Sequence, residues 1–208
     1  MTIDALLLAA ERMFADHGAG VPLREVAAAA GQRNNSAVQY YFGDRDGLVR
    51  AIVERRLEAV EASCARRLAA IDEGDTRALV EALVTALLDA AAEQGSTHYF
   101  RFLEVMRHRV KDWPPGEHSP AWATITDTLR ALLPGGTPLE RDSRISSMAT
   151  TLFALLADGE RTRESPGLLG PTPPQIVDMI VGLLRAPLGD RAPGNQAESS
   201  SSAPNALS

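Results

Sequence analysis

The chain has 208 residues, of which 45% are hydrophobic and 23% are charged, and its formal net charge is −6. These fractions are typical of a folded globular protein, and no apolar run reaches the roughly 20 residues of a membrane-spanning helix, so we expect no membrane partner. The single cysteine, Cys64, excludes an internal disulfide, and the lack of a leader-like pattern predicts a cytoplasmic protein.

Apolar residues recur at helical spacing along most of the chain, and no strand-like alternation interrupts them, so we predict an all-α fold with nine helices. Two capping boxes, Thr137 with Glu140 and Thr172 with Gln175, mark the starts of the last two helices. The predicted helices cover about 3–16, 23–30, 35–42, 45–71, 75–95, 97–110, 120–133, 138–158 and 173–186.

The predicted helices fall into two domains, 1–50 and 51–186. The tail, 187–208, is rich in Pro, Gly, Ser and Asn and is expected to be disordered, because it cannot bury enough apolar surface to offset the entropy of ordering. Residues 1–57 contain seven Arg and seven acidic residues, so the rest of the chain carries the whole negative charge. Because Arg offers a planar fork to phosphates and base edges, the acidic total does not exclude DNA binding.

The second and third predicted helices are short and are separated by a tight turn that contains Gly31, which is the pattern of a helix-turn-helix. The inner face of the third helix would carry Val38 with Tyr41 or Phe42. Its outer face is polar, uncharged and aromatic, which suits base edges, thymine methyl groups and phosphates. That outer face consists of Asn35, Ser36, Gln39 and Tyr40.

Residues 6–57 resemble the DNA-binding domain of the tetracycline-repressor (TetR) family. The matching motifs occur in order: Ala-Ala-Glu-Arg-Met-Phe at 9–14, Leu-Arg-Glu-Val-Ala-Ala-Ala-Ala-Gly at 23–31, Val-Gln-Tyr-Tyr-Phe at 38–42 and Asp-Arg-Asp-Gly-Leu at 44–48. The resemblance implies a homodimeric regulator that binds a double-stranded, palindromic operator and is released by a small-molecule effector. It also implies a helix-turn-helix domain followed by a helical domain for ligand binding and dimerisation.

The resemblance carries DNA contacts over to individual residues. Six of them match the recognition helix, a seventh matches a basic residue that grips a phosphate at the start of the fourth helix, and two more lie in the preceding turn. They are Asn35, Ser36, Ala37, Gln39, Tyr40 and Tyr41, then Arg45, then Arg33 and Asn34. Pro22 stands where the family usually has a capping Ser or Thr, and the basic N-terminal arm of many members is missing, so we expect weaker nonspecific affinity.

The second domain carries no motif of its own, so its candidate residues follow the family architecture. The dimer interface would lie on the last two helices, with Ile145, Met148, Leu152, Ile176, Met179, Ile180 and Leu183. An effector pocket would be lined by His98, Phe102, Met106, Trp113, Trp122 and Phe153. For each of these residues, packing inside its own protomer is the alternative.

Two other function classes are alternatives. A helical interaction module without DNA binding would not need the exposed polar face beside Arg45. An enzyme is disfavoured because the four histidines show no zinc spacing and no phosphate-binding loop is present, so we expect no cofactor and no metal. Single residues also have plainer readings. Arg45 could pair with Asp46 or Glu11, Cys64 could be half-buried, and Arg50, Arg55 and Arg56 could form a solvated helix face.

Overall fold

The computed structural model describes residues 3–31, 37–72, 74–93, 95–107, 109, 119–165, 167 and 169–187. Over these residues the chain is all-helical, which confirms the predicted fold class, and none of their helices is long and apolar enough to cross a membrane. The nine helices in these ranges are α1 Ile3–His17, α2 Leu23–Ala29, α3 Ala37–Phe42, α4 Arg45–Leu68, α5 Thr76–Glu93, α6 Tyr99–Met106, α7 Pro120–Leu132, α8 Pro138–Glu164 and α9 Pro173–Arg185. The predicted tail lies outside the described residues from 188 onward.

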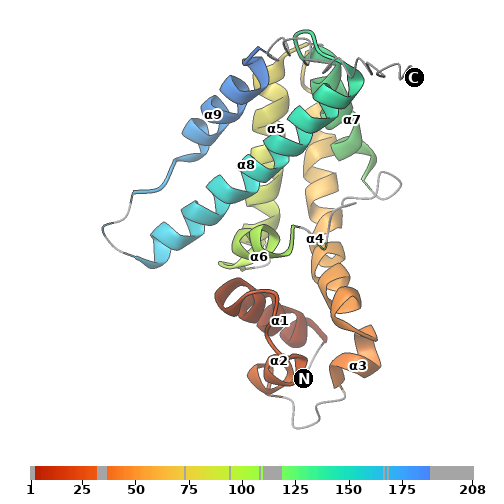
Figure 1. Cartoon of the computed structure of the whole chain (residues 1–208), viewed down its shortest axis with the longest axis vertical. Coiled ribbons are helices and arrows are strands. Elements are labelled where there is room, and N and C mark those ends of the chain that lie inside the picture. The colour runs from red at the N-terminus through yellow and green to blue at the C-terminus, as the bar shows by residue number, and fades with distance from the viewer. Residues whose placement is uncertain are drawn as a thin grey trace, which may run out of the picture.

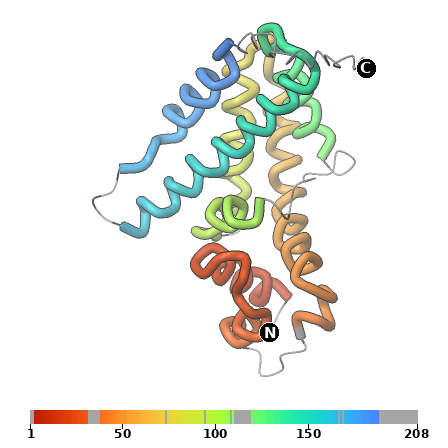
Figure 2. Tube along the Cα trace, viewed as in Figure 1, coloured from red at the N-terminus to blue at the C-terminus, as the bar shows by residue number. Residues whose placement is uncertain are grey.

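The helices α1–α3 gather at one end of the molecule, and α4 runs from that end to the far end of the second group of helices (Figure 1). The tube in Figure 2 shows the same path, with α5 and α7 beside α4. Helix α6 packs on both α1 and α8, and α9 packs on α5 and α8. The domain boundary predicted at residue 50 therefore falls inside one continuous helix, α4.

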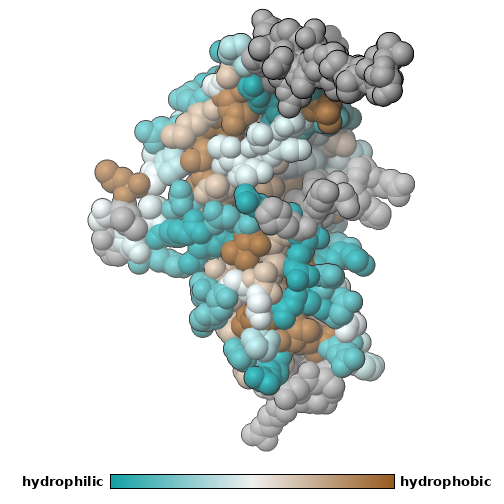
Figure 3. All heavy atoms as spheres, in the orientation of Figure 1, coloured by the Kyte–Doolittle hydropathy of each residue, from teal (hydrophilic) through white to brown (hydrophobic). Residues whose placement is uncertain are grey.

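One apolar core extends through both groups of helices. At the junction, Phe14 of α1 packs against Phe102 of α6, with 6.2 Å between ring centroids. Val38 of α3 and Leu48 of α4 are also buried in this core. Burial of each such side chain stabilises the fold by about 1.5–3 kcal/mol. The helices α1–α3 therefore pack on the second group of helices through a shared apolar core. On the face seen in Figure 3, hydrophobic patches are separated by hydrophilic side chains.

Local capping defines the last two helices as predicted. The Thr137 side chain accepts a hydrogen bond from the Glu140 N–H at 3.3 Å, and the Glu140 carboxylate accepts from the Thr137 N–H at 2.8 Å. The Gln175 side chain accepts from the Thr172 N–H at 2.9 Å. These bonds satisfy orphan groups of the first helical turns, so the sequence signal for both starts is confirmed.

Two other helices are capped by carboxylates that belong to neighbouring helices. Glu160 of α8 is buried and accepts the backbone N–H groups of Phe100 and Arg101 at 3.1 and 2.9 Å, at the start of α6. Burial raises the pKa of Glu160, and the two N–H bonds oppose that rise. Glu61 of α4 likewise accepts the backbone N–H groups of Ala121 and Trp122, the second and third residues of α7, at 2.5 and 3.2 Å. These contacts orient α6 and α7 in a way that chain-local signals do not encode.

Helix α8 continues to Glu164, six residues beyond its predicted end at Asp158. The extra turns are stabilised by tertiary contacts: Arg161 forms ion pairs with Glu104 of α6 and with Asp158. Arg101 of α6 reaches Glu164 at 2.8 Å. Helix α8 therefore ends where its contacts to α6 end.

A buried ion pair joins α1 to α4. The guanidinium of Arg56 donates from Nη2 and Nε to the Glu11 carboxylate at 2.6 and 3.2 Å, and it lies 4.3 Å from the centre of the Tyr99 ring. The Ser96 hydroxyl donates to the other oxygen of Glu11. This corrects the reading of Arg56 as part of a solvated face: its side chain is fully buried, because α1, α5 and α6 cover it.

Candidate nucleic-acid interface

Helix α3 is short and is held by one buried side chain. Val38 lies in the core, and Phe42 packs half-buried against it, as predicted. Gly43 follows the helix with a φ of 75°, a left-handed conformation that favours glycine and allows the chain to turn into α4. The position of α3 at the end of the molecule thus follows from its packing on α2 and α4.

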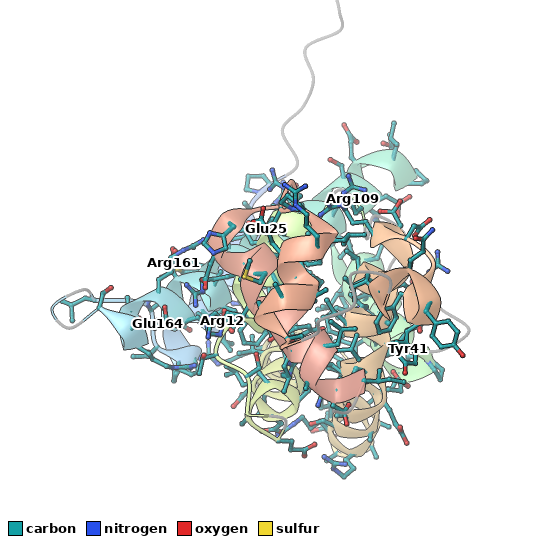
Figure 4. All side chains as sticks on the ribbon, turned by 90° about the horizontal axis from the view of Figure 1, so that it is seen from below. Arg12, Glu25, Tyr41, Arg109, Arg161 and Glu164 are labelled. Atoms are coloured by element: carbon teal, nitrogen blue, oxygen red, sulfur yellow. The ribbon has the colours of Figure 1, made fainter. Side chains whose placement is uncertain are left out.

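The opposite face of α3 is open to solvent. Gln39 is exposed, and the side chains of Tyr40 and Tyr41 are 82% and 52% exposed. The two tyrosine rings meet edge to face with 5.0 Å between centroids. Figure 4, which looks at the molecule from the α1–α3 end, shows Tyr41 projecting from the edge. Large aromatic side chains are seldom left this exposed without a partner, so this face can stack on or bond to an external group.

The remaining predicted DNA contacts on the turn lie outside the described residues. They are Arg33, Asn34, Asn35 and Ser36. Ala37 is the first residue of α3. DNA contact by these four turn residues and by Ala37 therefore stays a prediction.

Arg45 has a structural role that the sequence pattern did not indicate. Its Nη1 and Nη2 groups donate to the carbonyl oxygens of Ala19 and Val21, each at 2.7 Å. Its guanidinium carbon lies 5.5 Å from the centre of the Phe14 ring. These bonds tie the first turn of α4 to the loop between α1 and α2, in place of the pairing with an acidic side chain that was considered. Contact with a phosphate stays a prediction.

The predicted effector-contact residues that the structure describes belong to α6, its N-cap, α7 and α8. His98 is the N-cap residue of α6, and its ring Nε2 lies 3.6 Å from the Glu164 carboxylate. The others are Phe102, Met106 and Trp122, which are buried, Phe153, which is half-buried, and Trp113, which lies outside the described residues. Beside them the hydroxyl of Tyr99 is buried without a hydrogen-bond partner among the described residues. Burial also raises the pKa of Tyr99.

The predicted dimer residues lie mostly inside the protomer. Ile145, Met148, Leu152, Ile176 and Ile180 are buried, Leu183 is half-buried, and Met179 is 48% exposed. The five buried side chains belong to the core in which α8 and α9 pack on each other and α9 packs on α5. Among these residues Met179 is the one with a largely exposed side chain, and their role in a dimer interface stays a prediction.

The comparisons with known proteins add a likeness of fold to solved structures. No protein-family model and no curated protein matches the chain. The fold is similar to the crystal structure of a "putative transcriptional regulator" from Rhodococcus sp. RHA1, with 23% sequence identity over 90% of this chain and 97% of that chain and a TM-score of 0.45. A likeness at this identity and TM-score says nothing of function, so the function must be argued from the residues of this chain.

Proposed function

We propose that the chain is a sequence-specific, dimeric DNA-binding regulator of transcription of the TetR family. The observation that carries the proposal is the exposed face of α3, where Gln39, Tyr40 and Tyr41 stand out while Val38 anchors the helix. A solvated helix face without a function more often carries Glu and Lys. An uncharged face of amide and phenol groups instead suits base edges, thymine methyl groups and phosphates in the major groove.

The proposed reading head consists of α1–α3. Six helical residues span about 9 Å, which fits the roughly 12 Å width of the major groove. Helix α3 lies in the group α1–α3 at one end of the molecule (Figure 1), and a duplex would approach from that end. Arg33, Asn34, Asn35 and Ser36 would extend the contact along the turn.

The regulatory part of the proposal concerns the second group of helices. An effector would bind among α5 to α8, where Phe102, Met106 and Trp122 are buried. Two subunits would associate through the outer faces of α8 and α9, including Met179, and so present two reading heads to an inverted repeat. The effector would act as an inducer of a repressor by favouring the head spacing that does not fit the operator.

The test is selection of duplexes from a random library by the purified chain, followed by binding curves on the selected duplex. Tyr40→Ala and Gln39→Ala should each weaken binding to it by about five- to 150-fold per half-site, the range for one lost base contact. Leu139→Ala is the matched control, because Leu139 is 76% exposed and lies at the start of α8, away from α3.

An inverted repeat recovered by the wild-type chain and lost by the Tyr40 variant supports the proposal. If the wild-type chain enriches no duplex, or if both α3 variants bind as the Leu139 variant does, α3 is not a recognition helix. Circular dichroism of each variant checks that the fold is kept, which is expected since Gln39 and Tyr40 are exposed.

A further inference from the structure

The first turn of α4 follows α3 directly and carries three charges in sequence. Asp44 caps the helix by accepting the Gly47 N–H at 2.8 Å. Arg45 is occupied by the two carbonyl groups of the α1–α2 loop. Asp46 remains as a carboxylate that is 61% exposed beside the proposed reading head. An unpaired carboxylate there would repel the phosphates of an approaching duplex.

A guanidinium from the second group of helices reaches this carboxylate. Arg109 follows α6, and its backbone N–H donates to the Met106 carbonyl at 2.8 Å, which continues the last turn of the helix. Its Nη1 lies 2.6 Å from Asp46 Oδ1, although the two residues are 63 positions apart in the chain. The side chain of Arg109 is 43% exposed, and Figure 4 shows it from the end of the molecule that carries α1–α3.

The ion pair leaves Arg109 well suited to a second partner. Arg carries five N–H donors, and the bond to Asp46 uses one of them. Two exposed partners hold each other by about 0–1 kcal/mol, so exchanging the carboxylate for a phosphate costs little. A phosphate offers the same bidentate geometry as a carboxylate.

We infer that Arg109 is a contact to the DNA backbone supplied from outside the helix-turn-helix, and that Asp46 holds and neutralises it when no DNA is bound. The inference rests on the proposed function and adds to it a partner group, the phosphate flanking the bases read by α3. It also places Arg109, three residues beyond the end of α6, at the DNA surface, so that a shift of α6 would change the contact to the DNA backbone.

The decisive measurement compares Arg109→Ala with Asp46→Asn on the duplex selected by the wild-type chain, from 0.05 to 0.3 M salt. Loss of one phosphate contact lowers the magnitude of the slope of log K against log salt by about 0.9 per reading head. If variant and wild type bind equally at about 1 M salt, the variant therefore binds about eightfold more weakly per head at about 0.1 M salt. Asp46→Asn should act in the opposite direction and tighten binding about two- to threefold per head, because a charge that repels phosphate is removed.

Arg67→Ala is the matched control. Arg67 pairs with Asp89 between α4 and α5 at 2.9 Å with 39% of each side chain exposed, far along α4 from α3. It should leave both the affinity and the salt slope unchanged. Thermal unfolding of all three variants checks that none loses its fold.

The opposite expected changes in DNA affinity distinguish a DNA contact from a purely structural ion pair. If the pair only holds α6 against α4, both substitutions break it and both weaken binding, and the inference is overturned. It is also overturned if neither variant differs from Arg67→Ala. Should the wild-type chain select no duplex, the proposed function fails and this inference falls with it. If Tyr40→Ala loses binding but the Arg109 and Asp46 variants do not change affinity in opposite directions, the proposed function stands and only the role of Arg109 is wrong.

Discussion

Replacing Arg56 by Met tests how the reading end is attached to the rest of the fold. The substitution keeps the length and apolar stem of the side chain but removes every N–H donor. Among the described residues, Glu11, which is 3% exposed, then keeps only the Ser96 hydroxyl as a hydrogen-bond partner of its carboxylate. Breaking a buried ion pair by removing one partner costs about 3–5 kcal/mol. Because a chain of this kind unfolds with about 5–15 kcal/mol, the variant loses a large part of its stability.

The assay is urea unfolding followed by circular dichroism at a fixed protein concentration. With a slope near 2 kcal/mol per M, the loss should lower the midpoint by about 1.5–2.5 M. Arg12→Met is the matched control on α1, because Arg12 lies 3.9 Å from Asp16 and its side chain is 66% exposed. An exposed pair of this kind contributes little, so the control should unfold close to the wild-type midpoint.

The double variant Glu11→Met/Arg56→Met completes the reasoning. Removing both charges leaves an apolar pair of similar volume, so the double variant should be more stable than Arg56→Met alone. The account is refuted if Arg56→Met costs no more than Arg12→Met. It is also refuted if the double variant loses the sum of the two single losses, because the charges would then be uncoupled.

Three further predictions concern two buried groups, Cys64 of α4 and Glu160 of α8. Burial raises the pKa of the Cys64 thiol from 9.0 to about 12. The native chain should therefore resist a thiol reagent at about pH 8, whereas the chain unfolded in guanidinium should react fully. Prompt labelling of the native chain would contradict this. The stabilisation by the protonated thiol is complete below pH 9 and fades toward pH 12, so the stability lost in Cys64→Ala should shrink over that range. Glu160→Ala leaves two N–H groups of α6 without an acceptor and should cost about 1–3 kcal/mol in urea unfolding, whereas Glu160→Gln keeps an acceptor and should cost less. Equal losses would mean that the charge, not the capping, matters.

Much of the helical layout could be predicted because its determinants are local. The Thr137 and Thr172 capping boxes act over three residues, and Gly18 and Gly43 end helices with left-handed backbone conformations. The exposed face of α3 was also predictable, because the spacing of Val38 and its neighbours assigns one side of the helix to the core. Cys64 was expected to be half-buried but is fully buried, because it belongs to the core that α4 shares with other helices.

The tertiary structure alone decided the roles of the charged residues. Three arginines with polar neighbours in the sequence differ in this way. Arg45 donates to loop carbonyl groups, Arg56 is buried against Glu11, and Arg109 pairs with Asp46 near α3. Their partners lie 26, 45 and 63 residues away, respectively. The sequence by itself determines the starts of α8 and α9 and the ends of α1 and α3, because those interactions span about four residues, whereas the end of α8 depends on its contacts to α6. It does not determine which charges meet, since that depends on how finished helices pack and on how much water their contacts exclude.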